Sequence, residues 1–268
     1  MLFRSAASDA NFLFTHRSFP NVELYFVSNQ KDRAEQVNCA FRVAGRQPEL
    51  WNAVTGERRA LLEWSESAGQ TIVPLVFAPK QSWFVVFRQP GKPMTTRAKN
   101  FPEPKTVITL DRAWDVAFDP KWGGPEHAEF AQLADWTTRP EDGIKYYSGK
   151  ATYRTTFDLP ASALPVSNGK LMLDLGKVCD VATVRLNGQD LGTVWIAPWS
   201  VDISSAVKAG NNSLEVTVVN PWNNRLVGDA KLPVGQRLTS LSLQTVKPGA
   251  PLLPAGLLGP VTLQDIAP

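Results

Sequence analysis

The segment Ser213-Leu-Glu-Val-Thr-Val-Val219, followed by Asn220-Pro-Trp-Asn-Asn-Arg-Leu-Val-Gly-Asp229, decides the fold of this chain. Its first seven residues alternate between polar and apolar side chains, which predicts a half-buried β-strand. The next ten predict a loop with the groups that hold a sugar ring: Asn and Arg donate hydrogen bonds, Asp accepts them, and Trp offers a flat apolar face. The alternative is a structural loop, in which Asn and Asp cap turns and Trp fills the edge of the core.

Other motifs surround this segment in a characteristic order. They are Ile144-Lys-Tyr-Tyr-Ser-Gly-Lys-Ala-Thr-Tyr-Arg-Thr-Thr-Phe157, Val184-Arg-Leu-Asn-Gly-Gln-Asp-Leu-Gly192, Trp195-Ile-Ala-Pro-Trp-Ser-Val-Asp-Ile203, Val207-Lys-Ala-Gly-Asn-Asn-Ser-Leu-Glu-Val216 and Gly256-Leu-Leu-Gly-Pro-Val-Thr-Leu263. This order resembles the galactose-binding-like jelly roll of family 2 type glycoside hydrolases. From about residue 12 to its end, the chain resembles the C-terminal region of bacterial α-L-rhamnosidase-like enzymes, glycoside hydrolase family 106.

The resemblance implies a set of sugar-binding residues. The segment after Val219 would face the catalytic cleft of a barrel domain, or would brace the jelly roll against that barrel. The candidate sugar-binding residues are Trp195, Trp222, Asn224, Arg225 and Asp229. Related domains often carry a structural Ca²⁺ at loop carboxylates and carbonyls, so the resemblance allows a Ca²⁺ here; no other cofactor is expected and no metal ligand is assigned.

The remaining aromatic residues divide between site and core. Trp195 and Trp199 flank Pro198, and either could stack on a saccharide, although the alternating residues after Trp199 favour a core position for it. Trp122 and Trp136 are expected at an interface or edge. Tyr147 and Tyr153 are expected on one strand, with at least one of them in the core.

Composition narrows the class of protein. Hydrophobic residues make up 43% of the 268 residues and charged residues 20%, which is typical of a globular protein. No apolar run is long enough to span a bilayer. The net charge of +3, with scattered Lys and Arg, gives no indication of nucleic-acid binding. Cys39 and Cys179 are expected to be small buried hydrophobic residues rather than a disulfide.

The first part of the chain, residues 1–90, is predicted to be a small antiparallel β-sandwich. Short β-runs are expected at 22–27, its hairpin partner 37–43, 48–56, 71–77 and 82–88. By the resemblance, this domain flanks the catalytic barrel, and the turn from Asn52 to Gly56 is typical of it.

Residues 91–105 predict a linker, because proline is frequent there and apolar residues are scarce. Residues 106–268 then predict the jelly roll, with strands at 106–110 and 113–118 and a short helical turn within 125–133. No stretch shows the periodicity of a long amphipathic helix. The predicted fold class is all-β, as two antiparallel β-sandwich domains, the second a galactose-binding-like jelly roll.

A catalytic centre is not identifiable in the sequence. Most glycoside hydrolases use two carboxyl groups that flank the scissile bond, about 5 to 10 Å apart. In the family these come from the barrel, and this chain lacks the alternating strands and helices that build one. His16 and His127 are isolated, without zinc-site spacing. No residue is therefore assigned a catalytic role.

We expect the chain to be a non-catalytic accessory and carbohydrate-binding region of an α-L-rhamnosidase-like hydrolase. Its expected partners are a carbohydrate, by the resemblance a rhamnose-containing polysaccharide, and the catalytic barrel of a larger enzyme that is periplasmic or secreted. No nucleic-acid partner and no membrane span are expected. The alternative is a free-standing carbohydrate-binding or adhesion module without a catalytic partner.

Overall fold

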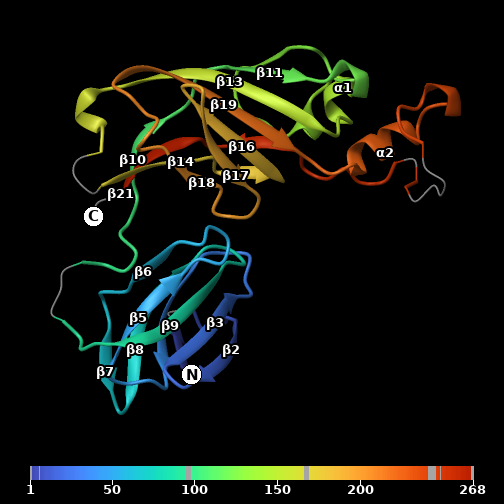
Figure 1. Cartoon of the computed structure of the whole chain (residues 1–268). Helices are drawn as coiled ribbons and strands as arrows, with labels where there is room; N and C mark the ends of the chain where they lie inside the picture. The colour runs from blue at the N-terminus through green and yellow to red at the C-terminus, as the bar shows by residue number, and fades with distance from the viewer. Residues whose placement is uncertain are drawn as a thin grey trace. The chain divides into compact units, whose positions relative to one another are not determined.

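The computed structural model describes residues 2–5, 7–94, 98–165, 169–240, 246–247 and 249–266. The chain divides into two compact units, residues 1–103 and 104–267 (Figure 1). The sheets are antiparallel throughout, and the described part contains two short α-helices, α1 (Asp142–Lys145) and α2 (Asn223–Asp229). The predicted all-β class is therefore confirmed.

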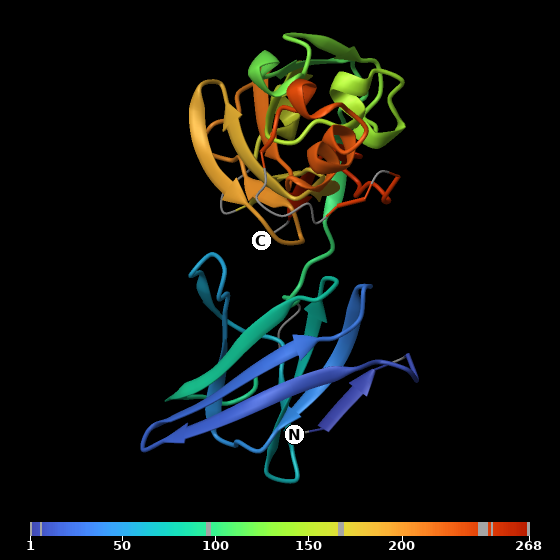
Figure 2. The same ribbon diagram turned by 90° about the vertical axis from the view of Figure 1, so that its right-hand side faces the viewer.

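The first unit is a sandwich of two sheets, which Figures 1 and 2 show from two sides. One has the order β1-β4-β8-β7, with β1 (Leu2–Ser5), β4 (Glu35–Phe41), β7 (Ser65–Ser67) and β8 (Gln70–Phe77). The other has the order β2-β3-β9-β5-β6, with β2 (Phe12–Phe19), β3 (Val22–Asn29), β5 (Arg46–Trp51), β6 (Arg58–Ala60) and β9 (Ser82–Pro90). Alternate residues of both sheets point into one core, which includes Tyr25, Val27, Cys39, Phe41, Leu75, Phe77, Val85 and Phe87.

The sequence predicted that residues 37–43 are the hairpin partner of residues 22–27, and this prediction is wrong. β3 pairs with β2 and β9, whereas β4 pairs with β1 and β8 in the opposite sheet. The buried Asn29 side chain lies at the end of β3, and its Nδ2 donates to Arg33 O (2.8 Å) and Ala78 O (3.0 Å). Alternation predicts where strands lie, but it does not say which strands pair.

The predicted turn from Asn52 to Gly56 is confirmed. Gly56 N donates to Asn52 O at 2.9 Å, and Asn52 Oδ1 accepts from Val54 N at 2.9 Å. Gly56 has φ +76°, a left-handed conformation that glycine adopts without steric cost.

The range 91–105, predicted as a linker, contains residues that pack on the first unit. Asn100 is buried; its Oδ1 accepts from Glu63 N (2.9 Å) and its Nδ2 donates to Glu63 O (2.6 Å). The ring of Phe101 lies 6.2 Å from that of Trp83. The later part of this range is therefore anchored by side-chain contacts.

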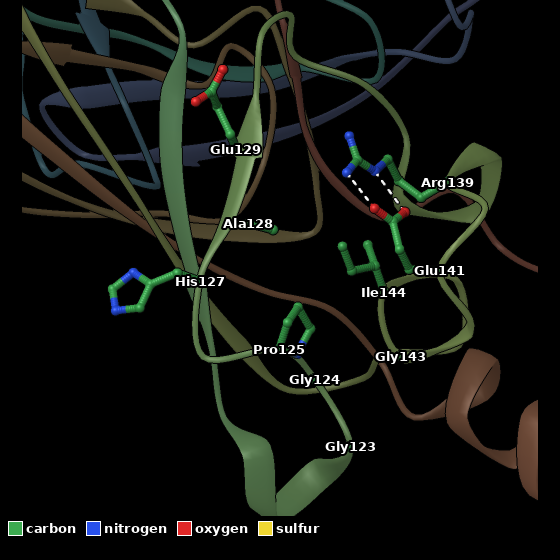
Figure 3. Close-up of a pocket in the computed structure, with 10 residues that line it drawn as sticks. All are labelled: Gly123, Gly124, Pro125, His127, Ala128, Glu129, Arg139, Glu141, Gly143 and Ile144. Carbon is green, nitrogen blue, oxygen red and sulfur yellow. Dashed lines mark hydrogen bonds and ion pairs between the residues drawn. The ribbon is translucent and has the colours of Figure 1, made fainter.

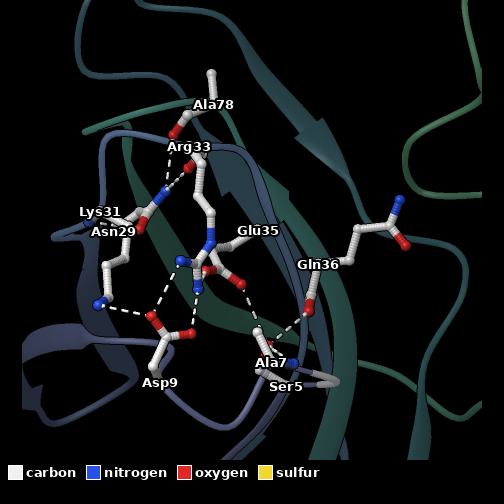
Figure 4. Close-up of polar contacts among 9 residues, drawn as sticks. All are labelled: Ser5, Ala7, Asp9, Asn29, Lys31, Arg33, Glu35, Gln36 and Ala78. Atoms are coloured by element: carbon white, nitrogen blue, oxygen red, sulfur yellow. Dashed lines mark hydrogen bonds and ion pairs between the residues drawn. The ribbon is translucent and has the colours of Figure 1, made fainter.

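An ion-pair network joins the segment after β1 to β4 in the first unit (Figure 4). Arg33 contacts two carboxylates, Asp9 Oδ1 at 2.5 Å and Glu35 Oε1 at 2.7 Å. Lys31 Nζ donates to Asp9 Oδ2 at 3.1 Å. The hydrogen bonds from Arg33 and then Lys31 hold the pKa of Asp9 well below its usual range.

The second unit contains two larger antiparallel sheets and a short ladder. The six-stranded sheet has the order β12-β11-β13-β19-β16-β17, with β11 (Trp114–Phe118), β12 (Ala128–Phe130), β13 (Lys150–Leu159), β16 (Val181–Leu186), β17 (Gln189–Val194) and β19 (Gly210–Val219). The four-stranded sheet has the order β10-β21-β14-β18, with β10 (Lys105–Thr109), β14 (Lys170–Asp174), β18 (Ser200–Asp202) and β21 (Thr262–Ile266). β15 (Lys177–Cys179) pairs with β20 (Gly256–Gly259).

The hairpin predicted around residues 184–192 is confirmed as β16 and β17. Asn187 and Gly188 form its turn with positive φ values of 52° and 83°, which suit an Asn-Gly pair. Asn187 Nδ2 donates to Ala206 O at 2.8 Å and to Asn212 Oδ1 at 2.9 Å. The turn is therefore held to the segment that leads into β19.

Trp136 lies in the core of the second unit, so its predicted edge position is wrong. Its Nε1 donates to the hydroxyl of Tyr153 at 2.5 Å, and its ring lies 5.3 Å from Phe118. The polar residues beside Trp136 misled the prediction, because Asp135 caps the 3₁₀ turn η2 (Trp136–Thr138) and leaves the indole facing inward. Tyr147 and Tyr153 are both fully buried, but Tyr147 precedes β13 rather than sharing it.

The helical turn predicted within residues 125–133 is also wrong, because this range holds the strand β12. β12 pairs with β11 in the register Trp114↔Phe130, which places Phe130 in the core. The remaining short helices are the 3₁₀ turns η1 (Pro120–Trp122), η3 (Ala161–Ala163) and η4 (Val234–Gln236). Cys39 and Cys179 are both buried and unbonded, as predicted. Among the residues that the structure describes, no helix is long and apolar enough to cross a membrane.

Candidate functional site

Residues 223–229 form helix α2 rather than the predicted loop. The chain leaves β19 at Asn220, whose side chain accepts from Gly149 N (2.9 Å) and donates to Tyr147 O (3.0 Å). Ser148 Oγ then accepts from Arg225 N at 3.1 Å. The first N–H groups of a helix need acceptors from outside it, and this hydroxyl is one. It comes from far along the chain, so the local sequence did not reveal the helix.

A cavity of about 260 Å³ lies beside α2. Its walls come from the residues before and within η1, the segment before β13, and α2 with the chain after it. The lining residues are Asp119, Trp122, Tyr147, Ser148, Gly149, Lys150, Trp222, Arg225 and Thr239. We call this the tryptophan cavity.

Two exposed tryptophans line the tryptophan cavity. Trp222 is 56% exposed and Trp122 is 39% exposed, and their ring centroids lie 6.0 Å apart at 58°. Trp122 ends η1, where Asp119 caps the turn and Gly123 follows with φ +76°. Two tilted indoles present flat apolar surfaces of the kind that pack against the C–H face of a sugar.

Arg225 supplies the polar part of this cavity from a buried position. It is only 7% exposed, and its Nη1 donates to Trp122 O at 3.5 Å. Its Nε lies 3.7 Å from Asp229 Oδ1, which is an ion pair without a hydrogen bond. Burial lowers the pKa of Arg225, and the nearby charges of Asp229 and Asp142 oppose that shift.

Asp229 and Asn224 do not line the cavity, and their hydrogen bonds brace α2. Asp229 Oδ2 accepts from the backbone N and the hydroxyl of Thr239, at 2.7 and 2.6 Å. Asn224 Nδ2 donates to Leu253 O at 2.7 Å, and its Oδ1 accepts from Leu253 N at 2.9 Å. These contacts match the structural alternative that the sequence left open.

The structure therefore brings two of the five predicted site residues together in this cavity, Trp222 and Arg225. Trp195 is 58% exposed just after β17 and does not line it, so its role in sugar binding stays a prediction. Trp199 is partly buried against the core of the second unit, as predicted. Sequence reasoning missed Trp122 as a partner of Trp222, and a residue a hundred positions away carries no local signal of that contact.

A second cavity of about 440 Å³ is lined in part by Gly123 and Gly124 and by none of the predicted site residues (Figure 3). Arg139 pairs with Glu141 there, through bonds of 3.0 and 2.7 Å. These bonds lower the pKa of Glu141. A general acid for glycoside hydrolysis needs a raised pKa, so Glu141 lacks that property.

The described ranges contain no group of three or more His, Cys, Asp or Glu side chains placed to hold a metal ion. The structural Ca²⁺ that the resemblance allows stays a prediction.

Comparison with known proteins identifies the relatives of this fold. The family described as alpha-L-rhamnosidase matches residues 3–65, and the family described as glycosyl hydrolase 2 galactose-binding domain-like matches residues 136–246. The structure of a rhamnosidase from Novosphingobium sp. PP1Y superposes with a TM-score of 0.89 and 39% identity, over 98% of this chain. The predicted resemblance to α-L-rhamnosidase-like glycoside hydrolases is confirmed. The second sandwich is accordingly the predicted galactose-binding-like jelly roll.

A putative beta-glucuronidase from Formosa agariphila is also similar, with 40% identity over 196 residues, or 65% of this chain. The chain spans 24% of the Novosphingobium rhamnosidase and 16% of the Formosa protein. It is thus a glycoside-hydrolase-related region that includes a galactose-binding-like domain, and it corresponds to a minor part of each larger relative.

Proposed function

We propose that this chain is a non-catalytic carbohydrate-binding region of an α-L-rhamnosidase-like glycoside hydrolase and that the tryptophan cavity is its binding site. In this proposal the region completes or braces the substrate cleft of a catalytic barrel outside this chain. One observation carries the proposal: Trp122 and Trp222 stay exposed at a cavity whose polar wall includes the buried Arg225.

The physical argument starts from the cost of exposed indoles. Clustered apolar side chains on a surface are usually found where a ligand or partner covers them. A sugar ring covers such surfaces with its C–H face while its hydroxyl groups exchange water for protein partners. Each neutral hydrogen bond then contributes only about 0.5–1.5 kcal/mol. We therefore expect weak binding, in the millimolar range that corresponds to about 4 kcal/mol.

The binding test uses the indole N–H resonances of the ¹⁵N-labelled chain. Methyl α-L-rhamnoside and a panel of other methyl glycosides are titrated while the signals of Trp122 and Trp222 are followed. The proposal expects both signals to shift with one saturable curve for at least one glycoside. Shifts confined to other tryptophans would contradict it.

Two variants provide a matched comparison, because Trp222 and Trp195 are almost equally exposed. Trp222→Ala should weaken binding about tenfold, since stacking on an aromatic ring contributes about 1 kcal/mol or more. Trp195→Ala should leave binding at this cavity unchanged. A loss of binding in Trp195→Ala with none in Trp222→Ala would move the site to Trp195.

The non-catalytic part of the proposal has its own test. The purified chain should not hydrolyse aryl α-L-rhamnosides or other aryl glycosides, because the proposal places the pair of catalytic carboxyl groups in the barrel outside this chain. Turnover that survives repurification and disappears in a single Asp or Glu variant would contradict this.

A barrel-containing parent enzyme separates this proposal from a free-standing carbohydrate-binding module. If the cavity completes the cleft, Trp222→Ala in that parent lowers kcat/KM for the natural glycan. If the region binds carbohydrate independently, the same variant loses glycan binding while kcat/KM for a small aryl glycoside is unchanged.

A further inference from the structure

The hydrogen bonds of Arg225 leave most of its guanidinium unused. A guanidinium has five N–H donors. Arg225 Nη1 has one long contact, with Trp122 O at 3.5 Å. Within the ranges that the structure describes, Nε is buried without a hydrogen-bond acceptor. A buried donor without an acceptor costs stability, and a charged donor costs more.

Asp229 does not accept a hydrogen bond from the guanidinium of Arg225. It compensates the charge of Arg225 from 3.7 Å, beyond hydrogen-bond distance. Its Oδ2 is already occupied by Thr239, and its Oδ1 is itself buried without a donor among the described residues. Asp229 therefore compensates the charge of Arg225 without accepting a hydrogen bond from it, and Arg225 itself lines the cavity.

Two glycines, Gly123 and Gly228, leave space for the guanidinium of Arg225. A Cβ added at Gly123 would lie 3.0 Å from Nη1, and one added at Gly228 would lie 3.0 Å from Nη2. The terminal nitrogens thus pack against backbone rather than side chains. A side chain at Gly123 would crowd Leu238 and Arg225, and one at Gly228 would crowd Tyr146 and Arg225.

Lys150 adds a second positive charge to the cavity wall. It is exposed, and its ammonium contacts no carboxylate in the described part of the chain. Asp119 is the lining carboxylate, and one of its oxygens accepts from Lys121 N at 2.9 Å. The lining therefore carries two cations, Arg225 and Lys150, and one anion, Asp119, and Asp229 pairs with Arg225 from outside the lining.

We propose that the tryptophan cavity takes a saccharide that carries a carboxylate, such as a uronic acid residue. The carboxylate accepts from the terminal nitrogens of Arg225 and from Lys150, while the ring packs against Trp122 and Trp222. A carboxylate matches a guanidinium better than a hydroxyl does, because it offers two acceptor oxygens and a charge. This inference rests on the proposed carbohydrate binding and specifies the class of its ligand.

The test compares sugars that differ only in the carboxylate. Methyl β-D-glucuronide is titrated against methyl β-D-glucoside, and methyl α-D-galacturonide against methyl α-D-galactoside, at low and high salt. At low salt we expect at least one uronide to bind about tenfold more tightly than its neutral partner, which corresponds to about 1.4 kcal/mol. High salt should reduce this difference in affinity, because Lys150 is exposed and salt screens its charge.

Single substitutions test which residues cause the preference for uronides over neutral glycosides, and they include changes that should leave the chain folded. Lys150→Gln should reduce the difference in affinity between uronide and neutral glycoside several-fold, whereas Lys177→Gln, a change at an exposed residue outside the cavity, should leave that difference unchanged. Arg225→Lys keeps the positive charge but removes the planar guanidinium with its several N–H donors. This variant should therefore also reduce the difference in affinity between uronide and neutral glycoside. Its melting temperature is measured to check that it is folded.

The outcomes separate this inference from the proposed function. Equal binding of uronides and neutral glycosides, still lost in Trp222→Ala, would overturn the acidic-ligand inference and leave carbohydrate binding intact. Absence of binding by any glycoside would overturn both. Acetate that binds as tightly as the uronides would show a simple carboxylate site and would also overturn the inference.

Discussion

Arg33 in the first unit and Arg225 in the second have opposite relations between burial and pairing. The Arg33 side chain is 46% exposed and contacts two carboxylates within 2.7 Å. The Arg225 side chain is 9% exposed, yet among the described residues its ion-pair partner Asp229 lies at 3.7 Å and its hydrogen bond to Trp122 O is 3.5 Å long. Burial should demand the better pairing, because desolvated charges are costly. We interpret Arg33 as structural and Arg225 as a residue whose donors are kept for a ligand.

The largest effect should come from Asp229→Ala. This change removes the buried carboxylate behind Arg225 and the acceptor of both Thr239 bonds. Removing one partner of a buried pair costs about 3–5 kcal/mol. Urea denaturation of the second unit measures this loss. A loss below about 1 kcal/mol would show that Arg225 does not need its counter-charge, and the comparison with Arg33 would fail.

Asn224→Ala should give the next largest loss. Its side chain makes two bonds to Leu253, and buried groups left unpaired cost about 1–3 kcal/mol. Equilibrium unfolding gives the stability, and glycoside titration under native conditions gives the affinity. Unchanged stability with lost affinity would return Asn224 to the binding site that the sequence had predicted.

Gly123→Ala should affect both stability and binding. Gly123 has φ +76°, and an added Cβ would meet Leu238 Cδ1 at 2.8 Å and Arg225 Nη1 at 3.0 Å. Left-handed backbone alone costs an L-residue about 1–2 kcal/mol. Gly188→Ala is the matched control, since Gly188 has φ +83° with nothing within 4 Å of an added Cβ. Only the Gly123 variant should also weaken glycoside binding; equal effects would mean that Arg225 does not depend on this space.

The smallest effect should come from Asp9→Asn in the Arg33 network. Asp9 is 59% exposed, so its ion pairs contribute little at neutral pH. The folded-state pKa of Asp9 is lowered, so this contribution is present above the ordinary aspartate pKa of about 4 and is lost as pH falls below it. The stability difference between wild type and variant, followed by urea denaturation from pH 6 to 2, should therefore shrink on acidification. A difference that grows instead would contradict the assignment.

The strands were predictable because their signal is local. Alternation in Ser213–Val219 gave β19, and the Asn187-Gly188 pair gave the β16–β17 hairpin. The pairing of β4 was not predictable, since alternation shows where a strand lies but not which strand it pairs with. β12 was missed because three residues give too short a pattern to distinguish strand from turn.

The site was predictable in residue types more than in geometry. Trp222 and Arg225 line one cavity, but Asn224 and Asp229, which have equally suitable chemistry, face Leu253 and Thr239 instead. The direction of each side chain depends on α2, whose first turn is held by a hydrogen bond from Arg225 N to Ser148 Oγ on a distant segment. Long-range contacts of this kind also explain why the proximity of Trp122 to Trp222 was missed.

A crystal structure of the chain soaked with the tightest-binding methyl glycoside tests the central claim most directly. We predict electron density for one sugar ring against Trp122 and Trp222, with a polar substituent within hydrogen-bond distance of Arg225 and with the Arg33 network unchanged. Density at Trp195 or in the cavity beside Arg139 and Glu141, with the tryptophan cavity empty, would contradict the account.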